Sequence, residues 1–276
     1  MDPLSGRVAL ITGAASGIGF GIAQACVAAG MRVALADVRA DVLKQAAARL
    51  GEAAVPQLLD VTDRGAWAAN VQSIEQQLGG IDLLCSNAGV NLFVPTQEAT
   101  YEDWDFVLGV NLKGAINAVH TVVPRMIAAG RPGHVVLTSS VNGLFTGPGA
   151  GVYATSKYAL VGLAESLRAD LKPHGIGVSV LCPGPVKSEL FESTAAVRPP
   201  HLARTASQPV VPPGVHREDT PIFRTAPTGE EIGRKVLEGV RSNNLYILTH
   251  PEMQEAIRTR FHDILEGRPP SPAIIA

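Results

Sequence analysis

The first two thirds of the chain alternate between short apolar segments and longer segments with helical character. The apolar segments are nearly continuous runs of Val, Ile, Leu and Ala, which is typical of strands buried on both faces of a parallel sheet. These predicted strands span 7–11, 32–36, 55–59, 81–86, 134–139 and 177–182. The predicted helices between them span 17–29, 40–50, 64–77, 101–128 and 151–171. The alternation predicts an α/β fold with a doubly wound parallel sheet between two helical layers, with ligands at the carboxyl ends of the strands.

The composition changes after Cys182. Nine of the 20 prolines lie between Pro183 and Pro227 without a sustained period, so we interpret 183–227 as a lid over a site or as disordered chain. A helix (228–241), a short strand (245–248) and a last helix (251–266) follow, and the tail 267–276 is expected to be loose. Since α/β folds reach this length as one unit, we expect a single domain spanning 1–276.

The charge balance and the apolar pattern argue against two classes of partner. With 23 Lys and Arg against 25 Asp and Glu, the net charge of -2 favours neither nucleic acid nor an anionic membrane surface. No apolar run is expected to reach the about 18 residues that a membrane helix needs. The N-terminus carries an acid and a proline and does not resemble a signal peptide.

The cysteines and histidines indicate neither disulfides nor a metal site. Cys26, Cys85 and Cys182 each lie inside an apolar run, so we expect buried, inert thiols in a reducing, cytoplasmic compartment. The seven histidines are dispersed without the paired spacing of metal ligands, and we expect His120 and His134 to be structural.

A glycine-rich turn, TGAASGIG at 12–19, joins the first predicted strand to the first helix. Glycines there permit a tight turn, close backbone approach to a pyrophosphate and close packing of the helix on the strand. The helix N-terminus adds free N–H groups and the positive end of its dipole. We therefore predict a phosphate cradle, with a plain turn as the alternative. Its expected cofactor-binding residues are Gly13, Ser16, Gly17, Ile18 and Gly19.

Asp37 ends the second predicted strand, 18 residues after Gly19. A carboxylate at this position can accept hydrogen bonds from both ribose hydroxyls of adenosine and would repel a 2′-phosphate, so NAD(H) is favoured over NADP(H). Arg39 could instead turn toward a 2′-phosphate, and Asp37 could simply cap a turn.

Tyr153 and Lys157 lie four residues apart near the start of a predicted helix, so both side chains project from one face. An ammonium close to a phenol favours the phenolate and is expected to lower the tyrosine pKa toward the range of a general acid or base. Ser140, at the end of the fifth strand, could stabilise charge on a substrate oxygen. The adjacent Ser139 is the alternative candidate for this role. Asn111 lies within a predicted helix, where Asn is unfavourable, which suggests a functional role.

In this order, these motifs resemble those of the short-chain dehydrogenase/reductase family. The similarity extends over about residues 5–190 and the terminal helix and strand, and it implies a Rossmann-like fold, a nicotinamide cofactor and a homo-oligomer, often a tetramer built through the helices at 101–128 and 151–171. Ser86 departs from the family pattern, which has Asn there. The motifs are the 12–19 turn, Asp60-Val61, Asn87-Ala88-Gly89, Asn111, Ser140, Tyr153 with Lys157, and Pro183-Gly184.

The resemblance implies a role for each matched residue. Tyr153 would be the general acid/base, Lys157 would lower its pKa and hold the nicotinamide ribose, Ser140 would polarise the substrate carbonyl, and Asn111 would anchor a water in a proton relay. The adenine would lie between Asp60 and Val61, with hydride passing reversibly between the nicotinamide and a secondary alcohol. Further residues implied at the cofactor are Asn87, Ala88, Gly89, Pro183, Gly184, Val186 and Ser188, the last where Thr is usual.

The loops after strands four to six carry apolar residues that suit a bulky hydrophobic alcohol or ketone, although each could instead pack the lid. The candidates for substrate contact are Phe93, Val141, Leu144, Phe145, Leu190 and Phe191. Three basic residues of the lid could bind a substrate carboxylate: Arg198, His201 and Arg204. We expect instead that they lie on a solvated face of the loop.

Segments at 123–127, 130–134 and 244–247 are similar to bacterial dehydrogenases that oxidise the benzylic Cα alcohol of lignin-derived β-aryl ethers. An aryl or benzylic alcohol is therefore the favoured substrate, with a steroid or another bulky alcohol as the alternative. A non-catalytic NAD(H)-binding sensor would not need a tuned phenol. A nucleotide-sugar epimerase would space its glycines differently and carry a larger C-terminal domain.

Overall fold

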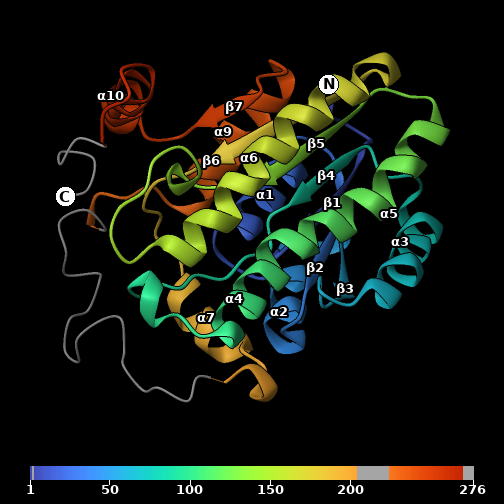
Figure 1. Cartoon of the computed structure of the whole chain (residues 1–276). Helices are drawn as coiled ribbons and strands as arrows, with labels where there is room; N and C mark the ends of the chain where they lie inside the picture. The colour runs from blue at the N-terminus through green and yellow to red at the C-terminus, as the bar shows by residue number, and fades with distance from the viewer. Residues whose placement is uncertain (2, 204–223, 270–276) are drawn as a thin grey trace.

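One parallel sheet occupies the centre of the molecule (Figure 1). The computed structural model describes residues 1, 3–203 and 224–269. The strands are β1 (Val8–Thr12), β2 (Arg32–Asp37), β3 (Ala54–Leu58), β4 (Leu83–Ser86), β5 (Gly133–Thr138), β6 (Ile176–Cys182) and β7 (Tyr246–Leu248). Their order across the sheet, β3-β2-β1-β4-β5-β6-β7, confirms the predicted doubly wound Rossmann-like topology. The strand order reverses between β1 and β4, which is where such sheets bind ligands.

Helices cover both faces of the sheet because both the sheet and the helices have apolar surface to bury. On one face α1 (Gly17–Ala28), α2 (Ala40–Leu50) and α9 (Gly229–Arg241) share a buried cluster with β1 and β2. On the other face α3 (Arg64–Leu78), α5 (Gly114–Ala129) and α6 (Gly151–Leu171) form a second cluster around Trp67 and Leu137. Glycines with positive φ follow α1, α2 and α5, at Gly30, Gly51 and Gly130.

The predicted helix at 101–128 is one helical run with an irregular centre. It consists of α4 (Tyr101–Leu108), a π-helical turn (Gly109–Lys113) and α5. The expectation that no stretch is long and apolar enough to cross a membrane is wrong by length and composition, since Tyr101–Ala129 meets both criteria. Half of its most apolar window is nevertheless buried inside the protein, where α4 contacts α6 and α5 contacts α3.

The predicted lid contains structure that its composition did not indicate. Within it lie the helix α7 (Leu190–Val197) and a 3₁₀ turn (Pro200–Leu202). The rest of the lid between 204 and 223, Arg204 included, lies outside the described residues, as does most of the predicted tail, 270–276. The last helix, α10 (Gln254–Leu265), follows a 3₁₀ turn at Pro251–Met253.

The thiols and His134 are buried, as expected. All three cysteines are free, and burial raises the pKa of Cys26 and of Cys182 to about 12, so both stay protonated and unreactive. Burial lowers the pKa of His134 to about 3, and its Nε2 lies 2.8 Å from the Ser179 hydroxyl. His134 is therefore a neutral structural residue.

Candidate active site

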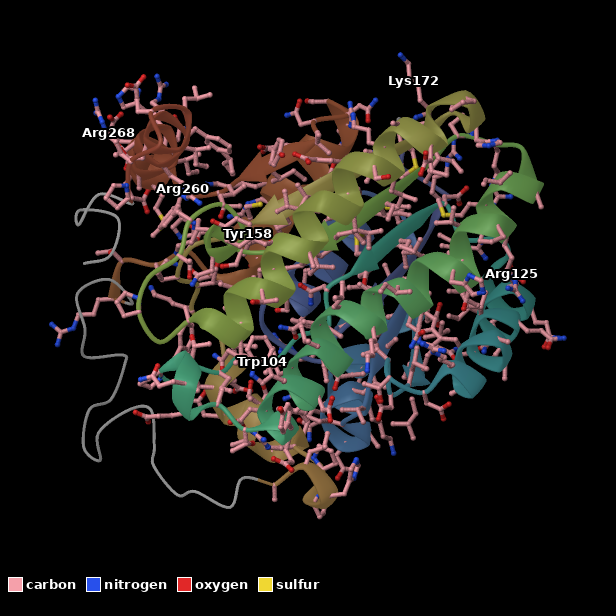
Figure 2. The ribbon with its side chains drawn as sticks, viewed as in Figure 1. Trp104, Arg125, Tyr158, Lys172, Arg260 and Arg268 are labelled. Atoms are coloured by element: carbon pink, nitrogen blue, oxygen red, sulfur yellow. The ribbon has the colours of Figure 1, made fainter. Side chains whose placement is uncertain are left out.

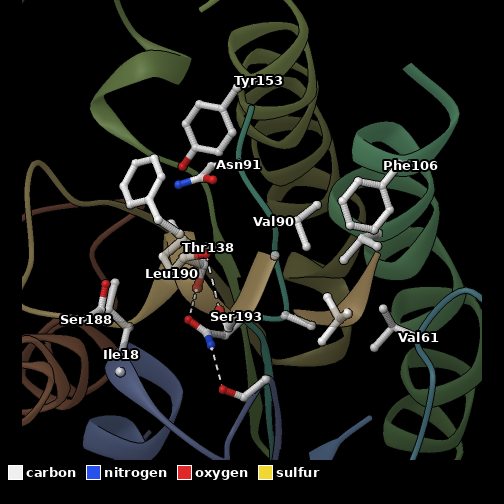
Figure 3. A pocket seen from close by; sticks show the side chains of 18 of the residues that line it. Ile18, Val61, Val90, Asn91, Phe106, Thr138, Tyr153, Ser188, Leu190 and Ser193 are labelled. Carbon is white, nitrogen blue, oxygen red and sulfur yellow. Dashed lines mark hydrogen bonds between the residues drawn. The ribbon is translucent and has the colours of Figure 1, made fainter. Parts of the chain in front are cut away.

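A cavity of about 610 Å³ opens at the carboxyl edge of the sheet (Figure 3). It is lined by the loops that follow β1, β2, β4, β5 and β6, by α7 and by the start of α6. Most of the predicted cofactor and catalytic residues line it, and Gly19 and Asn111 do not. Those that do are Gly13, Ser16, Gly17, Ile18, Asp37, Asp60, Val61, Asn87, Ala88, Gly89, Ser140, Tyr153, Lys157, Pro183, Gly184, Val186 and Ser188.

The glycine-rich turn leaves the N-terminus of α1 open toward this cavity. The N-cap Ser16 makes no side-chain hydrogen bond to the helix, so the first amides keep their hydrogen-bonding capacity. Gly13 has φ +62°, and a Cβ there would lie 2.8 Å from Ala88 Cα. A Cβ on Gly19 would lie 2.2 Å from Gly13 O, so Gly19 is required for close packing beneath the turn. The turn fits a pyrophosphate.

Asn87 and Thr12 join the ends of three strands. The Thr12 hydroxyl accepts hydrogen bonds from the backbone N–H groups of Asn87 (2.9 Å) and Ala88 (3.0 Å). The Asn87 amide donates to Thr12 O at 3.1 Å and accepts from the Thr138 hydroxyl at 3.2 Å. These bonds hold the loop after β4 against β1 and β5, so the departure from the family pattern at buried Ser86 leaves the loop anchored.

Asp37 is buried and braces the turn. Its Oδ2 accepts from Ala15 N at 3.1 Å, and its Oδ1 accepts from Arg39 N at 3.0 Å. The Arg39 guanidinium bonds the same carboxylate at 3.2 Å and donates to the Ser16 hydroxyl at 2.9 Å. Asp37 thus acts as a turn residue, and it lines the cavity as well. Arg39 is folded back over Asp37 and does not extend away from it.

Ser139 and Ser140 have different partners. The Ser139 hydroxyl donates to Lys157 O at 2.7 Å and so ties β5 to α6, which is a structural role. The Ser140 hydroxyl accepts from Asn142 N at 3.1 Å and donates weakly to Pro183 O at 3.3 Å. Of the two rivals, Ser140 is the one whose hydroxyl acts on Tyr153, because hydrogen bonding from it lowers the Tyr153 pKa.

Tyr153 and Lys157 are both buried on one face of α6. The Lys157 ammonium donates to Thr138 O at 2.9 Å and lies 5.5 Å from the centre of the Tyr153 ring. Burial raises the pKa of Tyr153 to about 12, although hydrogen bonding from Ser140 lowers it, and burial lowers the pKa of Lys157 to about 8. The expected depression of the tyrosine pKa is therefore absent, because the loss of solvation on burial disfavours the charged phenolate.

Asn111 lies in the π-helical turn, a geometry that is frequent at functional sites. Its Oδ1 accepts from Val90 N at 2.8 Å, and its Nδ2 donates to Val90 O and to the Ser156 hydroxyl, each at 3.0 Å. Both amide hydrogens are thus used within the protein, and they fix the loop at Val90 against α6. The role of Asn111 in anchoring a relay water stays a prediction.

The other end of the cavity is apolar. The ring centre of Phe93 lies 5.5 Å from that of Tyr153 and 5.9 Å from that of Phe191. Val141 and Leu190 also line this end. Leu144 and Phe145 do not line the cavity; they pack against the core beneath α6, so core packing explains both and the prediction of substrate contact fails for them.

Two polar contacts, of the lid and of the segments after β6 and β7, and one buried amide in the loop after β4 were missed at the sequence level. Arg198 bonds buried Asp103 of α4 at 2.7 Å and lies over the Phe106 ring, so it is neither solvated nor free for a carboxylate. His250 accepts from Gly184 N at 3.0 Å. Asn91 lines the cavity with a buried amide. No motif marks these positions, because each pairing joins residues distant in sequence.

Comparison with known proteins agrees with this geometry. A family model described as short chain dehydrogenase matches residues 7–198. The C alpha-dehydrogenase of Sphingobium sp. (strain NBRC 103272 / SYK-6) is 38% identical over 98% of this chain and 89% of its own length. The 1-deoxy-11-beta-hydroxypentalenate dehydrogenase of Streptomyces exfoliatus is 32% identical over 98% of this chain and 93% of its own length.

Solved structures give the same result. A short chain dehydrogenase/reductase from Burkholderia phymatum in complex with NAD is 32% identical, covers 98% of both chains and superposes with a TM-score of 0.92. The apo form of LigD from Sphingobium sp. strain SYK-6 is 35% identical, with a TM-score of 0.80 over 98% of this chain and 100% of that one. From its motifs, its fold and these relatives, the chain belongs to the short-chain dehydrogenase family.

Proposed function

We propose that this oxidoreductase transfers hydride reversibly between NAD(H) and a bulky hydrophobic secondary alcohol or its ketone, with an aryl or benzylic alcohol favoured. The observation that carries the proposal is the position of Tyr153. It lines the cavity together with the open N-terminus of α1 on one side, and its ring lies 5.5 Å from Phe93 at the apolar end. A reacting carbon beside Tyr153 would have a dinucleotide on one side and an apolar group on the other.

The residues supply a proton path and a polar clamp for the reacting oxygen. Oxidation of a secondary alcohol removes a hydride from carbon and a proton from oxygen; when bound, the nicotinamide accepts the hydride. Tyr153 takes the proton in oxidation and returns it in reduction. Ser140 donates a hydrogen bond to the same substrate oxygen. With a pKa of about 12, Tyr153 rests as the protonated phenol, which is the form that reduction uses. Oxidation needs the phenolate, and the Lys157 ammonium, 5.5 Å from the centre of the Tyr153 ring, is the cation that would stabilise it.

The names of the relatives support an alcohol as substrate. One is named C alpha-dehydrogenase and another 1-deoxy-11-beta-hydroxypentalenate dehydrogenase. The aromatic pair Phe93 and Phe191 favours an aryl group over a saturated ring system, because aromatic rings gain from offset and edge contacts. A hydroxysteroid or similar bulky alcohol is the second candidate. It is favoured by the size of the cavity and by the non-aromatic Leu190 and Val141 at the same end.

A panel of secondary alcohols tests the proposal. Aryl, steroid and short aliphatic alcohols are each incubated with the enzyme and NAD⁺, and reduced nicotinamide is followed by absorbance. We expect aryl alcohols to give the highest kcat/KM. Reduction of NAD⁺ by none of them would contradict the proposed activity, and a preference for steroids would favour the second candidate. Binding of NADH without turnover of any alcohol would indicate the non-catalytic sensor.

Preference for NAD(H) rests on Asp37. Its buried carboxylate lies at the edge of the cavity and would repel a 2′-phosphate, and Arg39 is already bonded to it. We expect NADH to bind more tightly than NADPH, and Asp37→Ala to shrink that difference by about tenfold, because one charge repulsion is removed. Titration calorimetry of both nucleotides measures the ratio; tighter binding of NADPH to the parent protein would contradict the assignment.

We also infer a cytoplasmic homo-oligomer with a single domain. Three buried free thiols suit a reducing compartment. Ile116 on α5 and Tyr158 on the outer side of α6 (Figure 2) leave apolar surface exposed on the two helices expected at a subunit interface. Light scattering after size-exclusion chromatography gives the oligomeric state, and a monomeric mass would contradict the interface.

A further inference from the structure

A buried histidine lies directly behind one wall of the cavity. The wall is the loop after β6, where Pro183, Gly184 and Pro185 line the cavity. His250, in the segment after β7, is only 6% exposed and is not one of the described residues that line the cavity. Its ring packs against the loop so closely that a Cβ on Gly184 would lie 2.9 Å from the His250 Cγ. His250 therefore supports the loop from behind.

Both ring nitrogens of His250 have backbone partners whose roles are fixed. The N–H of Gly184 donates to Nδ1 at 3.0 Å, so Nδ1 must carry the lone pair. Nε2 lies 2.8 Å from the carbonyl oxygen of Pro185, which can only accept, so Nε2 must carry the hydrogen. Only the neutral ring protonated at Nε2 makes both bonds, since protonated Nδ1 cannot accept from Gly184. In this form the ring holds two peptide groups of the loop at once.

His250 is itself held in place. Leu248 of β7 pairs with Cys182 of β6, so the segments that follow these two strands leave the sheet side by side. The Thr249 hydroxyl lies 2.8 Å from His250 Nδ1, and the Thr249 carbonyl accepts from the Lys235 ammonium of α9 at 2.6 Å. The ring is thus a fixed support and does not follow the loop when the loop moves.

The same loop is bonded on its other side to the end of β5. The N–H of Val141 donates to Pro183 O at 2.9 Å, and the Ser140 hydroxyl donates to the same oxygen at 3.3 Å. A short loop therefore connects His250 to the hydroxyl that we propose for the substrate oxygen. With bonds at three successive residues, the loop has little freedom, and a site held in this way is preorganised.

We propose that His250 is a positioning residue, which in its neutral form holds the 183–185 loop as the wall against which the nicotinamide ring lies. This rests on the proposed function, since it takes this cavity as the site of NAD(H). Hydride transfer requires the reacting groups to be held within about 0.5 Å of the productive geometry. A loop released by loss of His250 would hold the nicotinamide less well, whereas the adenosine and pyrophosphate end would be unaffected.

A comparison of two nucleotides tests the assignment without turnover. ADP-ribose contains the adenosine, both phosphates and the second ribose of NADH but lacks the nicotinamide. We expect the parent to bind NADH more tightly than ADP-ribose in titration calorimetry. In His250→Leu, whose side chain makes no hydrogen bond, the ratio of the two affinities is expected to fall by about tenfold, which corresponds to one hydrogen bond. The affinity for ADP-ribose itself is expected to stay within about twofold of the parent value.

Two conservative variants each keep one of the bonds. His250→Asn has an amide oxygen that can accept from Gly184, and His250→Gln has an amide nitrogen that can donate to Pro185. Each is expected to have a ratio between those of the parent and of His250→Leu. Should His250→Leu fail to fold, these two variants decide, and the full parent ratio in both would overturn the assignment. His174→Leu, in an exposed 3₁₀ turn at Lys172–His174, is the control and is expected to keep the parent ratio.

Three further results would overturn the role of His250. One is equal affinity of the parent for NADH and ADP-ribose, because the wall would then not contact the nicotinamide. The second is an unchanged ratio in a folded His250→Leu. The third is a parallel loss of both affinities in that variant, because His250 would then support the whole nucleotide site.

Failure of the proposed function gives a different result, in which the parent oxidises none of the alcohols of the panel. A parent that oxidises an alcohol but keeps its nucleotide ratio in His250→Leu retains the proposed function, and only the role of His250 is lost.

Discussion

The two ends of the cavity are built in different ways. The nucleotide end is made of backbone at the strand ends, with glycines where Cβ atoms would clash and with Thr12, Asp37 and Asn87 bonded to neighbouring loops. The apolar end is made of side chains from the loop after β4 and from α7, which is attached to the rest of the fold through contacts such as those of Thr194 and Arg198. We therefore expect the cofactor to meet rigid backbone and the proposed substrate to meet side chains.

Tyr153 lies where the two ends meet, and its removal is expected to have the largest effect. Tyr153→Phe keeps the ring against Phe93 but deletes the hydroxyl, so kcat should fall by about 10³-fold, the usual contribution of a general acid or base. NADH affinity should change little, because the nucleotide end stays intact. Steady-state kinetics and NADH titration on one preparation separate these effects. Activity within tenfold of the parent would exclude Tyr153 from proton transfer.

The nucleotide end should tolerate no added Cβ. Gly13→Ala would combine a positive φ with a contact of 2.8 Å to Ala88 Cα, so we expect NADH affinity to fall by more than about tenfold and stability by about 2–3 kcal/mol. Gly175→Ala is the matched control, with φ +67° and open space around its Cβ, so it reports backbone strain alone, about 1 kcal/mol. Chemical denaturation and NADH titration provide both measurements. Equal losses in the two variants would show that the close approach to Ala88 is unimportant.

Burial of Lys157 predicts a pH-dependent stability. Its pKa is about 8 when folded and 10.5 in its ordinary state, so between these pH values the unfolded chain binds more protons than the folded chain. Stability from this group therefore rises with pH over that window. Relative to Lys157→Met, we expect the parent to gain about 2 kcal/mol in unfolding free energy from pH 7.5 to pH 10. Urea titrations at both pH values provide the test; parallel curves for the two proteins would place the lysine in a more polar environment than the structure indicates.

The smallest expected effect concerns the attachment of the lid. Arg198→Ala removes a bond to Asp103 and a cation–π contact with Phe106, at the apolar end only. We expect KM for a bulky alcohol to rise about fivefold, corresponding to about 1 kcal/mol, with NADH affinity unchanged. Arg234→Ala, which removes an exposed helix-surface pair with Glu230, is the control and should leave both constants as they are. A matching loss of NADH affinity in Arg198→Ala would mean that the two ends are not independent.

Local sequence patterns correctly predicted the features that depend on residues close together in the chain. The strands agree within one or two residues, because buried parallel strands need continuous apolar runs. Tyr153 and Lys157 share a face because helical periodicity requires it. Leu144 and Phe145 were predicted wrongly, since an apolar residue after a strand can contact either a substrate or the core, and only the fold distinguishes the two.

Periodicity and the conformational freedom of glycine at particular positions were enough to predict the sheet, the glycine-rich turn and the order of the proposed catalytic residues. Tertiary structure alone decided the π-helical turn at Asn111, the helix in the lid, the pairing of Arg198 with Asp103 and the unsatisfied amide of Asn91. It also reversed the expected pKa shift of Tyr153, since the loss of solvation depends on everything that packs around a side chain and not on the residue four positions away.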